Sequence, residues 1–285
     1  MTTEAIHPPT PDAAHVARDP SQPGPLLPAL SLARRELVRF LRQRNRIIGA
    51  LATPLVFWLL IGGGMGRSLN FAGMTGDSYI RYFFPGTLVM ILLFTAIFST
   101  ISIIEDRREG FLQSVLVAPV PRSAIVLGKV LGGTILATGQ GLLFLLLAPL
   151  VGFRFTPASF AITLLLMLIL SFALTALGFC LAWRMTSTQG FHAFMNLFLM
   201  PMWFLSGALF PPTGAWPGLK YLMLLNPLTY GLAGMRRALL LPDAAANNIP
   251  GPSLLTALVV SIAFAVVLYW VASAVARRPS AADLH

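Results

Sequence analysis

Charge is scarce in this chain of 285 residues. Asp, Glu, Lys and Arg together make up 11% of the sequence, whereas hydrophobic residues make up 56%. Soluble domains carry about 25% charged residues, so this composition argues against a soluble fold. The mean hydropathy of +0.77 points the same way. The chain is therefore expected to lie in a membrane.

Groups for catalysis, disulfide bonding and metal binding are also missing. The single cysteine, Cys180, excludes a disulfide within the chain, and we expect it to be a small packing residue. No His, Cys, Asp and Glu cluster has metal-ligand spacing, so no metal site is predicted, and His192 is expected at a helix end or interface. Ser206 has no evident base, which disfavours an intramembrane enzyme.

No energy source is visible in the chain. The long apolar segments contain no Asp or Glu, whereas ion-driven transporters usually bind their coupling ion through such groups at membrane depth. The nucleotide-binding pattern GxxxxGK[ST] is absent, because Ser123 stands where the first glycine should precede Gly128–Lys129. Uphill transport would need a separate motor, so no cofactor is expected in this chain.

Six apolar segments reach the roughly 20 residues that a helix needs to cross a bilayer. They lie at about 47–66, 82–104, 125–151, 158–183, 191–210 and 254–276. Barrel strands would be shorter and would alternate, so the sequence predicts an all-α polytopic membrane protein with six transmembrane helices. Residues 1–28, rich in Pro and Ala, are expected to form a disordered cytoplasmic tail, and 277–285 a short cytoplasmic tail.

The distribution of Lys and Arg predicts the orientation. With the N-terminus inside, the cytoplasmic segments hold fourteen of these residues and the outer segments six. This bias places both termini in the cytoplasm. Anionic lipid head groups are the expected neighbours of the +10 net charge, so no nucleic-acid partner is needed to explain it.

A basic amphipathic helix is predicted before the first span, from about Leu30 to Arg46. One side carries Leu30, Ala33, Leu37, Phe40 and Leu41, and another carries Arg35, Arg39, Arg42 and Arg46. This pattern is typical of a helix in the inner membrane interface, with its arginines among lipid phosphates. The alternative is a solvated basic segment that only fixes topology.

The connection from Glu105 to Lys129 is unusually elaborate for a loop between two spans. Glu105, Asp106 and Glu109 are expected in the first turns of a short helix at about 105–117, near the positive end of its dipole. An apolar face follows, formed by Phe111, Leu112, Val115 and Leu116. Pro119 and Pro121 then stop the helix, and Arg122 begins the next span. Such a helix could dock a soluble partner or lie on the inner membrane surface, and these residues leave both open.

The connection resembles a known family. The block E-D-R-R-E-G-F-L-x-x-x-L-V-A-P-V-x-R-x-x-I-x-x-G-K is similar to the loop between spans two and three of type-2 ATP-binding-cassette exporter permeases. A second block agrees in order and spacing: Pro201, Phe204-Leu205-Ser206-Gly207, Phe210-Pro211, Trp216-Pro217, Asn226-Pro227-Leu228-Thr229-Tyr230 and Arg236. The resemblance covers about residues 28–276 and implies one transmembrane domain at 29–276. Phe111 departs from the small hydroxyl residue that is frequent in the family.

The resemblance implies a permease subunit of an exporter in the cytoplasmic (inner) membrane. Two such subunits, identical or related, would pair, and two copies of a cytoplasmic ATPase subunit would bind ATP and Mg. The implied ATPase-coupling residues are Glu105, Arg107, Arg108, Glu109, Gly110, Phe111, Leu112, Leu116, Pro119, Pro121 and Arg122. The helix with Arg35, Arg39, Arg42 and Arg46 would assist.

The segment between spans five and six is implied to form an outer gate. Its residues are Ser206, Gly207, Phe210, Pro211, Trp216, Asn226, Pro227, Tyr230 and Arg236. Trp216–Leu225 and Pro227–Leu240 are each too short to span, which predicts re-entrant half-helices, with Arg236 at the outer interface. The alternative is an interfacial loop anchored by Trp216 and Tyr221.

The spans suit an amphiphilic substrate, such as a drug or antibiotic, a lipid or a lipid-linked saccharide. Their surfaces are aliphatic and aromatic, and Met195, Met200, Met202 and Met223 add adaptable surface or ordinary core. A passive channel or a membrane scaffold subunit without ATP coupling is the alternative function.

Overall fold

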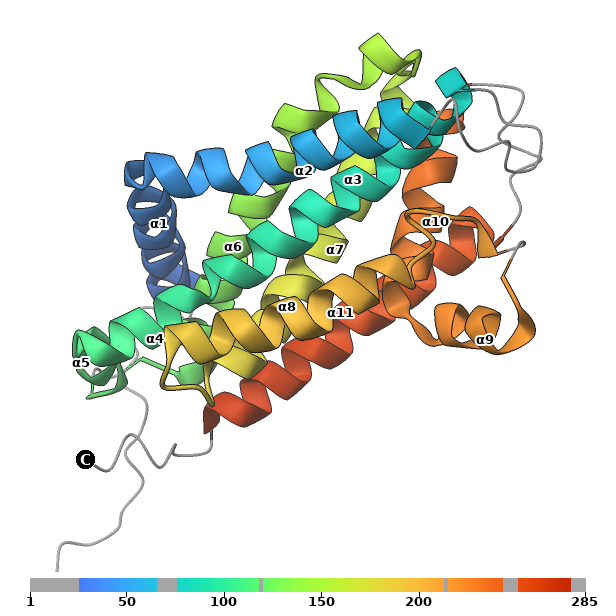
Figure 1. Cartoon of the computed structure of the whole chain (residues 1–285). Coiled ribbons are helices and arrows are strands. Elements are labelled where there is room, and N and C mark those ends of the chain that lie inside the picture. Colours follow the sequence, from blue (N-terminus) through green and yellow to red (C-terminus); the bar gives the residue numbers. More distant parts are fainter. Residues whose placement is uncertain (1–25, 66–75, 118–119, 213–214, 243–250, 278–285) are drawn as a thin grey trace, which may run out of the picture.

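The computed structural model describes residues 26–65, 76–117, 120–212, 215–242 and 251–277, and these residues form helices and connections without a strand (Figure 1). The all-α prediction is therefore confirmed for this part of the chain. The tails predicted at both ends lie almost entirely outside the described residues.

The helices follow one another along the whole chain. They are α1 (Leu26–Arg42), α2 (Arg44–Met65), α3 (Gly76–Ser99), α4 (Ile101–Arg108), α5 (Phe111–Val117), α6 (Arg122–Leu145), the 3₁₀ turn η1 (Ala148–Val151), α7 (Pro157–Ala182), α8 (Thr188–Phe204), α9 (Pro217–Leu225), α10 (Pro227–Leu240) and α11 (Leu254–Arg277). In Figure 1, α4 and α5 lie at one end of the bundle, and α9 and α10 lie at the other.

Within the described residues, five stretches of helix are long and apolar enough to cross a membrane. They are Ile47–Gly64, Tyr79–Arg108, Arg122–Leu145, Pro157–Ala182 and Leu254–Arg277. The sixth predicted span, 191–210, coincides with α8, which has only 17 residues and ends at Phe204. Six spans therefore stay a prediction.

Helix α3 forms the centre of the bundle. Its spanning stretch is 83% buried, whereas those of α2 and α11 are 17% buried. Aromatic rings join it to its neighbours, because Phe84 stacks on Phe144 of α6 at 4.5 Å and meets Trp58 of α2 at 5.7 Å. The outward faces of α2 and α11 are as apolar as this core, which is expected where lipid replaces water as the solvent.

Helix α1 crosses the end of the bundle rather than running along α2 (Figure 1). Two glycines of α6 let it lie close. A Cβ on Gly128 would stand 2.7 Å from the carbonyl oxygen of Ala29, and one on Gly132 would stand 2.8 Å from Cβ of Glu36. Because these clashes involve backbone or the base of a side chain, α1 reaches this position only over glycine.

Replacing Gly128 with Ala is therefore expected to push α1 away from α6 and destabilise the fold by about 1–3 kcal/mol, since the new methyl group overpacks a rigid contact. The matched control is Gly139→Ala on the same helix, where an added Cβ meets nothing within 4 Å. Thermal unfolding of the solubilised protein followed by circular dichroism should show a lower Tm for the first variant only. Equal Tm values would contradict the close approach.

Candidate functional site

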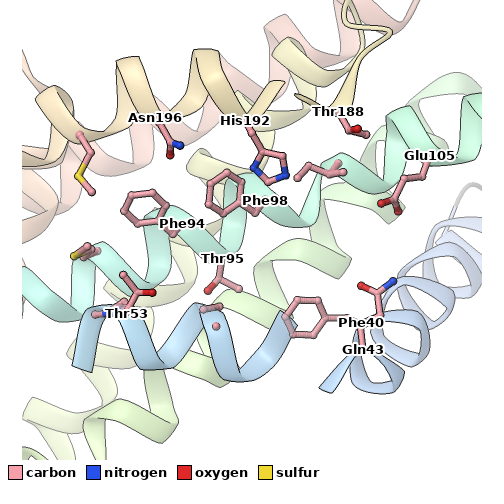
Figure 2. A pocket seen from close by; sticks show the side chains of 16 residues that line it. Phe40, Gln43, Thr53, Phe94, Thr95, Phe98, Glu105, Thr188, His192 and Asn196 are labelled. Carbon is pink, nitrogen blue, oxygen red and sulfur yellow. The ribbon is translucent and has the colours of Figure 1, made fainter. Parts of the chain in front are cut away.

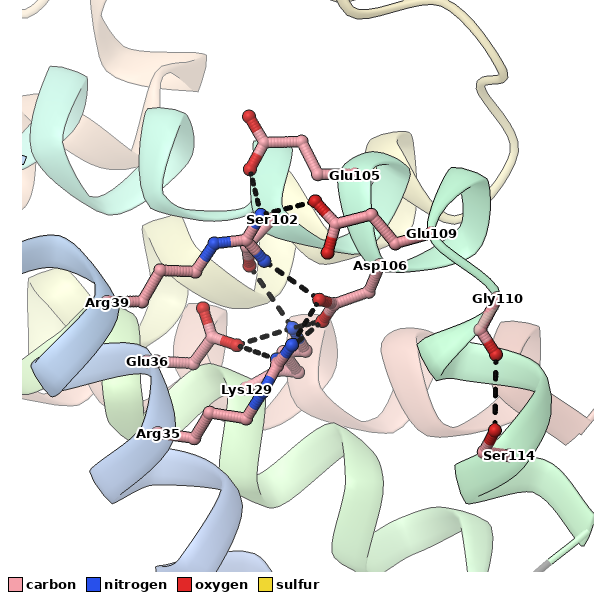
Figure 3. A network of polar contacts seen from close by, with 10 residues as sticks. All are labelled: Arg35, Glu36, Arg39, Ser102, Glu105, Asp106, Glu109, Gly110, Ser114 and Lys129. Atoms are coloured by element: carbon pink, nitrogen blue, oxygen red, sulfur yellow. Dashed lines mark hydrogen bonds and ion pairs between the residues drawn. The ribbon is translucent and has the colours of Figure 1, made fainter.

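A network of charged side chains joins α1, α4 and α6 at one end of the bundle (Figure 3). We call it the charge network, and it consists of Arg35, Glu36, Arg39, Ser102, Glu105, Asp106, Glu109 and Lys129. It lies where α4 ends and the chain turns into α5.

Asp106 is the centre of the network and is fully buried. Its Oδ1 accepts from Nη2 of Arg35 at 2.9 Å and from Nη1 of Arg39 at 2.8 Å. Its Oδ2 accepts from Nη1 of Arg35 at 3.1 Å and from Nζ of Lys129. A buried carboxylate is very costly unless it is paired, and here three cations satisfy it.

Lys129 is the buried cation, and its side chain is 4% exposed. Its Nζ donates to Oε1 of Glu36 at 2.6 Å, to Oγ of Ser102 at 3.2 Å and to Asp106. Three acceptors match the three protons of an ammonium group, so this charge is compensated within the protein.

Arg39 connects the buried Asp106 with carboxylates nearer the solvent. Its Nη2 contacts Oε2 of Glu105 at 2.9 Å and Oε1 of Glu109 at 3.2 Å, and the Glu109 side chain is 57% exposed. Burial opposes the charge of Arg35, but the hydrogen bond to Asp106 and the negative charges of Asp106, Glu36 and Glu109 together outweigh it and raise the pKa of Arg35 above its ordinary value. Arg35 therefore stays charged.

The predicted helix at 105–117 is wrong in its boundaries. Glu105 and Asp106 lie in the last turn of α4, Glu109 is its C-cap, and a new helix begins only at Phe111. The break is at Gly110, whose φ of +74° is a left-handed conformation that favours glycine. Acidic side chains at a helix C-terminus are destabilised by the negative end of the helix dipole. The positive charges of Arg35, Arg39 and Lys129 compensate for this unfavourable interaction.

The predicted interfacial helix also needs correction. Helix α1 ends at Arg42, and Arg46 belongs to α2 with its side chain outside the described part. Arg35 and Arg39 bind Asp106 instead of lipid phosphates, because a buried carboxylate attracts them more strongly than a solvated anion. The predicted apolar face divides, since Ala33 and Phe40 are buried whereas Leu30 and Leu41 are exposed.

Helix α5 is held by its first turn. The guanidinium carbon of Arg35 lies 3.7 Å from the ring centroid of Phe111, and Leu112 is buried in the core of the bundle. Leu112 therefore anchors α5 to its own chain, which corrects the expectation that it faces a partner. Gln113 and Ser114 are exposed. Pro119 and the side chain of Leu116 lie outside the described residues.

The three remaining arginines of the predicted coupling set bind backbone carbonyls at or just beyond the ends of other helices. Arg107 donates to the carbonyls of Trp183 at 2.7 Å and Met185 at 3.0 Å. Arg108 donates to the carbonyl of Thr186 at 2.9 Å. Arg122, which directly follows Pro121 at the N-cap of α6, donates to the carbonyls of Ala276 at 3.0 Å and Arg277 at 3.1 Å. These bonds tie α4 to the end of α7 and α6 to the end of α11.

The other end of the bundle carries a second polar centre around the carbonyl of Gly207. It accepts from Oη of Tyr82 at 3.0 Å and from Nη2 of Arg236 at 2.7 Å, and Arg236 also lies over the Tyr82 ring at 4.1 Å. Gly207 has a φ of +84° and ends the turn after α8. Oγ of the buried Ser206 donates to the carbonyl of Trp203 at 2.6 Å.

Two short helices, α9 and α10, occupy the segments predicted as half-helices, and their re-entrant position stays a prediction. Asn226 separates them. Its Nδ2 donates to the carbonyl of Met202 at 2.6 Å, and its Oδ1 accepts from the backbone N–H of Leu228 at 3.0 Å, so it caps α10 while Pro227 occupies the first position. Trp216 is exposed, whereas Phe210, Pro211 and Tyr230 are half-buried.

A cavity of about 770 Å³ lies between α2, α3 and α8, and we call it the aromatic cleft (Figure 2). Its lining includes Phe40, Thr53, Phe94, Phe98, His192 and Asn196. His192 and Asn196 of α8 face the two phenylalanines of α3, and the rings of His192 and Phe98 are 5.0 Å apart. His192 was expected at a helix end or interface, and it lies near the start of α8 in the wall of this cavity.

Sequence reasoning missed the central members of the charge network. Asp106 was expected only at a helix start, and Lys129 only near the end of a span. The available signal was that Lys129 is the one charged residue between 125 and 151, and that Glu36 is the one acid among the arginines before the first span. A charge in an apolar segment requires a partner.

The family assignment agrees with this architecture. The chain belongs to the ABC-2 type transporter family, whose family model matches residues 29–240. It is similar to the inner membrane transport permease YadH of Escherichia coli (strain K12), with 26% identity over 261 residues that cover 87% of this chain and 94% of that protein. Nodulation protein J of Sinorhizobium fredii is 28% identical over 196 residues, which cover 68% of this chain and 74% of that protein.

The class follows from the family and the apolar helices. The chain is a multi-pass membrane permease subunit of an ABC transporter, it is not itself an enzyme, and its family implies an ABC ATPase partner.

Replacing Asp106 with Asn should destabilise the protein by about 3–5 kcal/mol, because Lys129 and two arginines then face a neutral amide in a buried site. Replacing the exposed Glu109 with Gln is the control and should cost less than about 1 kcal/mol. Thermal unfolding can be followed with a thiol-reactive dye, since Cys180 is the only thiol. Equal losses in both variants would mean that Asp106 is not the central anion.

Replacing Asn226 with Ala removes a helix cap and a hydrogen bond to α8, so we expect a loss of about 1–3 kcal/mol. Asn226→Asp keeps the capping oxygen but cannot donate to the Met202 carbonyl, and its stability should fall between those of the wild type and the Ala variant. Chemical unfolding of the three proteins measures this order. If Asn226→Asp lowers the stability as much as Asn226→Ala does, the capping oxygen contributes nothing.

Proposed function

We propose that this chain is the permease subunit of an ATP-driven exporter that moves an amphiphile out across the cytoplasmic membrane. The observation that carries the proposal is the charge network, which fixes α1, the end of α4 and the first turn of α5 to one another. A subunit that is moved by a partner needs its contact helix to be firmly attached to the bundle. If that helix were loosely attached, it would move locally and the conformational change would not reach the other helices.

In this proposal α5 is the coupling helix and the exposed side of its first turns receives the ATPase. Gln113 and Ser114 are exposed there, while Leu112 and the Phe111–Arg35 contact hold the helix from the inside. ATP binding on the partner would close the ATPase pair and move α5. The network would pass that movement to α1, α4 and α6, which shifts the population between inward-open and outward-open states.

The proposed topology has six spans, with α8 as the fifth, and both termini in the cytoplasm. The fourteen-to-six distribution of Lys and Arg supports this orientation. Two permease subunits, identical or related, would enclose the path with two ATPase subunits. The exposed apolar faces of α2 and α8, including Leu60 and Leu197, offer a surface for that pairing.

On the outer side, α9 and α10 would be re-entrant half-helices that form the exit gate. The polar centre at Gly207 supports this reading, because Tyr82 and Arg236 satisfy a bent backbone that lipid could not. A passive channel or a scaffold subunit is the alternative, and it would show no effect of ATP on flux.

Replacing Glu109 with Lys should uncouple the exporter. The new cation would stand beside Arg39 and push the start of α5 away, while the buried centre at Asp106 stays paired. In vesicles that contain this chain and its ATPase, we expect ATP-driven efflux to fall at least tenfold with normal membrane insertion. The partner's ATP hydrolysis should no longer respond to this chain.

Glu109→Gln is the matched control, since it removes the same charge without adding a cation, and it should keep most of the efflux. Lys220→Gln, at a residue of α9 far along the bundle, should keep all of it. Unchanged efflux and unchanged stimulation of ATP hydrolysis in Glu109→Lys would refute the coupling role.

A further inference from the structure

A second hollow adjoins the aromatic cleft. It has a volume of about 670 Å³ along α1, and we call it the arginine groove. Its lining includes Arg34, Arg35, Arg39, Arg42, Gln43 and Glu109. Gln43, the residue between α1 and α2, lines both hollows, so the groove and the cleft meet at the corner where the chain turns into the bundle.

The two hollows differ in their charge. Among the side chains that the structure describes, no Lys or Arg lines the cleft, and the one carboxylate, Glu105, is already paired with Arg39 at 2.9 Å. In the groove, Arg35 and Arg39 are bound to Asp106. Arg34 and Arg42 are exposed, and within the described part of the chain no ion pair joins either of them to a carboxylate.

Among the described side chains of this corner, Arg34 and Arg42 therefore provide the charge that no carboxylate pairs with. They lie eight residues apart on α1, or about 12 Å along its axis. A guanidinium group offers a planar fork of donors that matches phosphate oxygens, so two such groups along one groove favour a phosphate-type anion.

The cleft, in contrast, suits a hydrocarbon chain. Phe94, Phe98, Met90 and Met200 line it, and aromatic rings and thioethers adapt well to flexible apolar ligands. The outward faces of the helices that border it are apolar too, with Leu60 on α2 at 68% exposed and Leu197 on α8 at 75%.

We propose that the arginine groove and the aromatic cleft together form one binding site for an amphiphile with a phosphate-type head group. The head group lies between Arg34 and Arg42, and the hydrocarbon tail passes Gln43 into the cleft. This inference rests on the proposed function, since it names the chemical class of the cargo. A cationic amphiphile is disfavoured, because it would have to compete with Arg39 for Glu105.

Binding to the purified chain, without ATPase or nucleotide, tests the site separately from ATP coupling. The probe is dodecyl phosphate in a neutral maltoside detergent, with the Kd measured by native mass spectrometry. The double variant Arg34→Gln/Arg42→Gln should raise the Kd at least tenfold. The matched control Arg184→Gln/Arg277→Gln removes two other exposed arginines and should change the Kd less than twofold.

A second pair of variants tests the tail compartment. A Cβ added at Gly49, which lines the cleft, meets nothing within 4 Å, so Gly49→Phe is chosen to place a ring in the cavity. It should raise the Kd for dodecyl phosphate at least tenfold. Gly139→Phe is the control, because it is equally open but lies on α6 outside the cleft, and it should leave the Kd unchanged.

Three further ligands complete the experiment. Inorganic phosphate should show no binding at concentrations that saturate with dodecyl phosphate, and dodecyltrimethylammonium should bind at least tenfold more weakly. Displacement of the probe by undecaprenyl phosphate or by dioleoyl phosphatidylglycerol identifies a lipid-linked phosphate or an ordinary bilayer lipid as the natural source, and both outcomes support the site.

Four results would overturn the proposal. They are unchanged affinity in the Arg34/Arg42 variant, inorganic phosphate binding as tightly as dodecyl phosphate, displacement by neither lipid, and tighter binding of the ammonium probe that is lost in Glu105→Gln. None of these results bears on coupling, because the ATPase is absent. Coupling is measured separately, in vesicles that contain the ATPase, so either proposal can fail while the other stands.

Discussion

The burial of Asp106 is the constraint on which this end of the molecule depends. A carboxylate with no exposed surface in an apolar bundle is tolerated only when its charge is balanced nearby. Arg35, Arg39 and Lys129 supply that balance from two other helices. The position of α1 across the bundle, its close contact with the glycines of α6 and the site where α5 begins all follow from bringing these cations to one point.

The same arrangement separates two tasks along α1. Arg35 and Arg39 bind Asp106 of α4 and so stabilise the fold. Arg34 and Arg42, on the same helix, remain exposed. One face of α1 therefore binds α4 through ion pairs, and another face presents exposed positive charge. At the far end, Tyr82 and Arg236 donate hydrogen bonds to the carbonyl of Gly207. Both ends of an otherwise apolar bundle therefore depend on a few polar groups whose partners lie within the protein.

The sequence predicted two of the long helices, α7 and α11, closely, whereas the predicted span 125–151 runs six residues beyond the end of α6 at Leu145. The bounds of α7 and α11 agree with the predicted spans to within one residue at each end, because uninterrupted apolar runs between Pro, Gly or charged residues define them locally. The half-helices around Asn226 were predicted for a similar local reason, a proline after a capping residue. The break at Gly110 and the pairing of Asp106 with Arg35 were not predicted. The first depends on a left-handed backbone, and the second joins residues 71 positions apart that only the tertiary fold brings together.

The shortness of α8, the proposed fifth span, has a consequence for the bilayer around it. A helix of 17 residues is about 25 Å long, which is less than the roughly 30 Å of a typical hydrocarbon layer. Such a mismatch is relieved either by local thinning of the membrane or by protein that covers the helix end. The turn after Phe204 is covered in this way by α3 and α10, so the lipid beside α8 is expected to be compressed chiefly at the opposite end, next to Thr188.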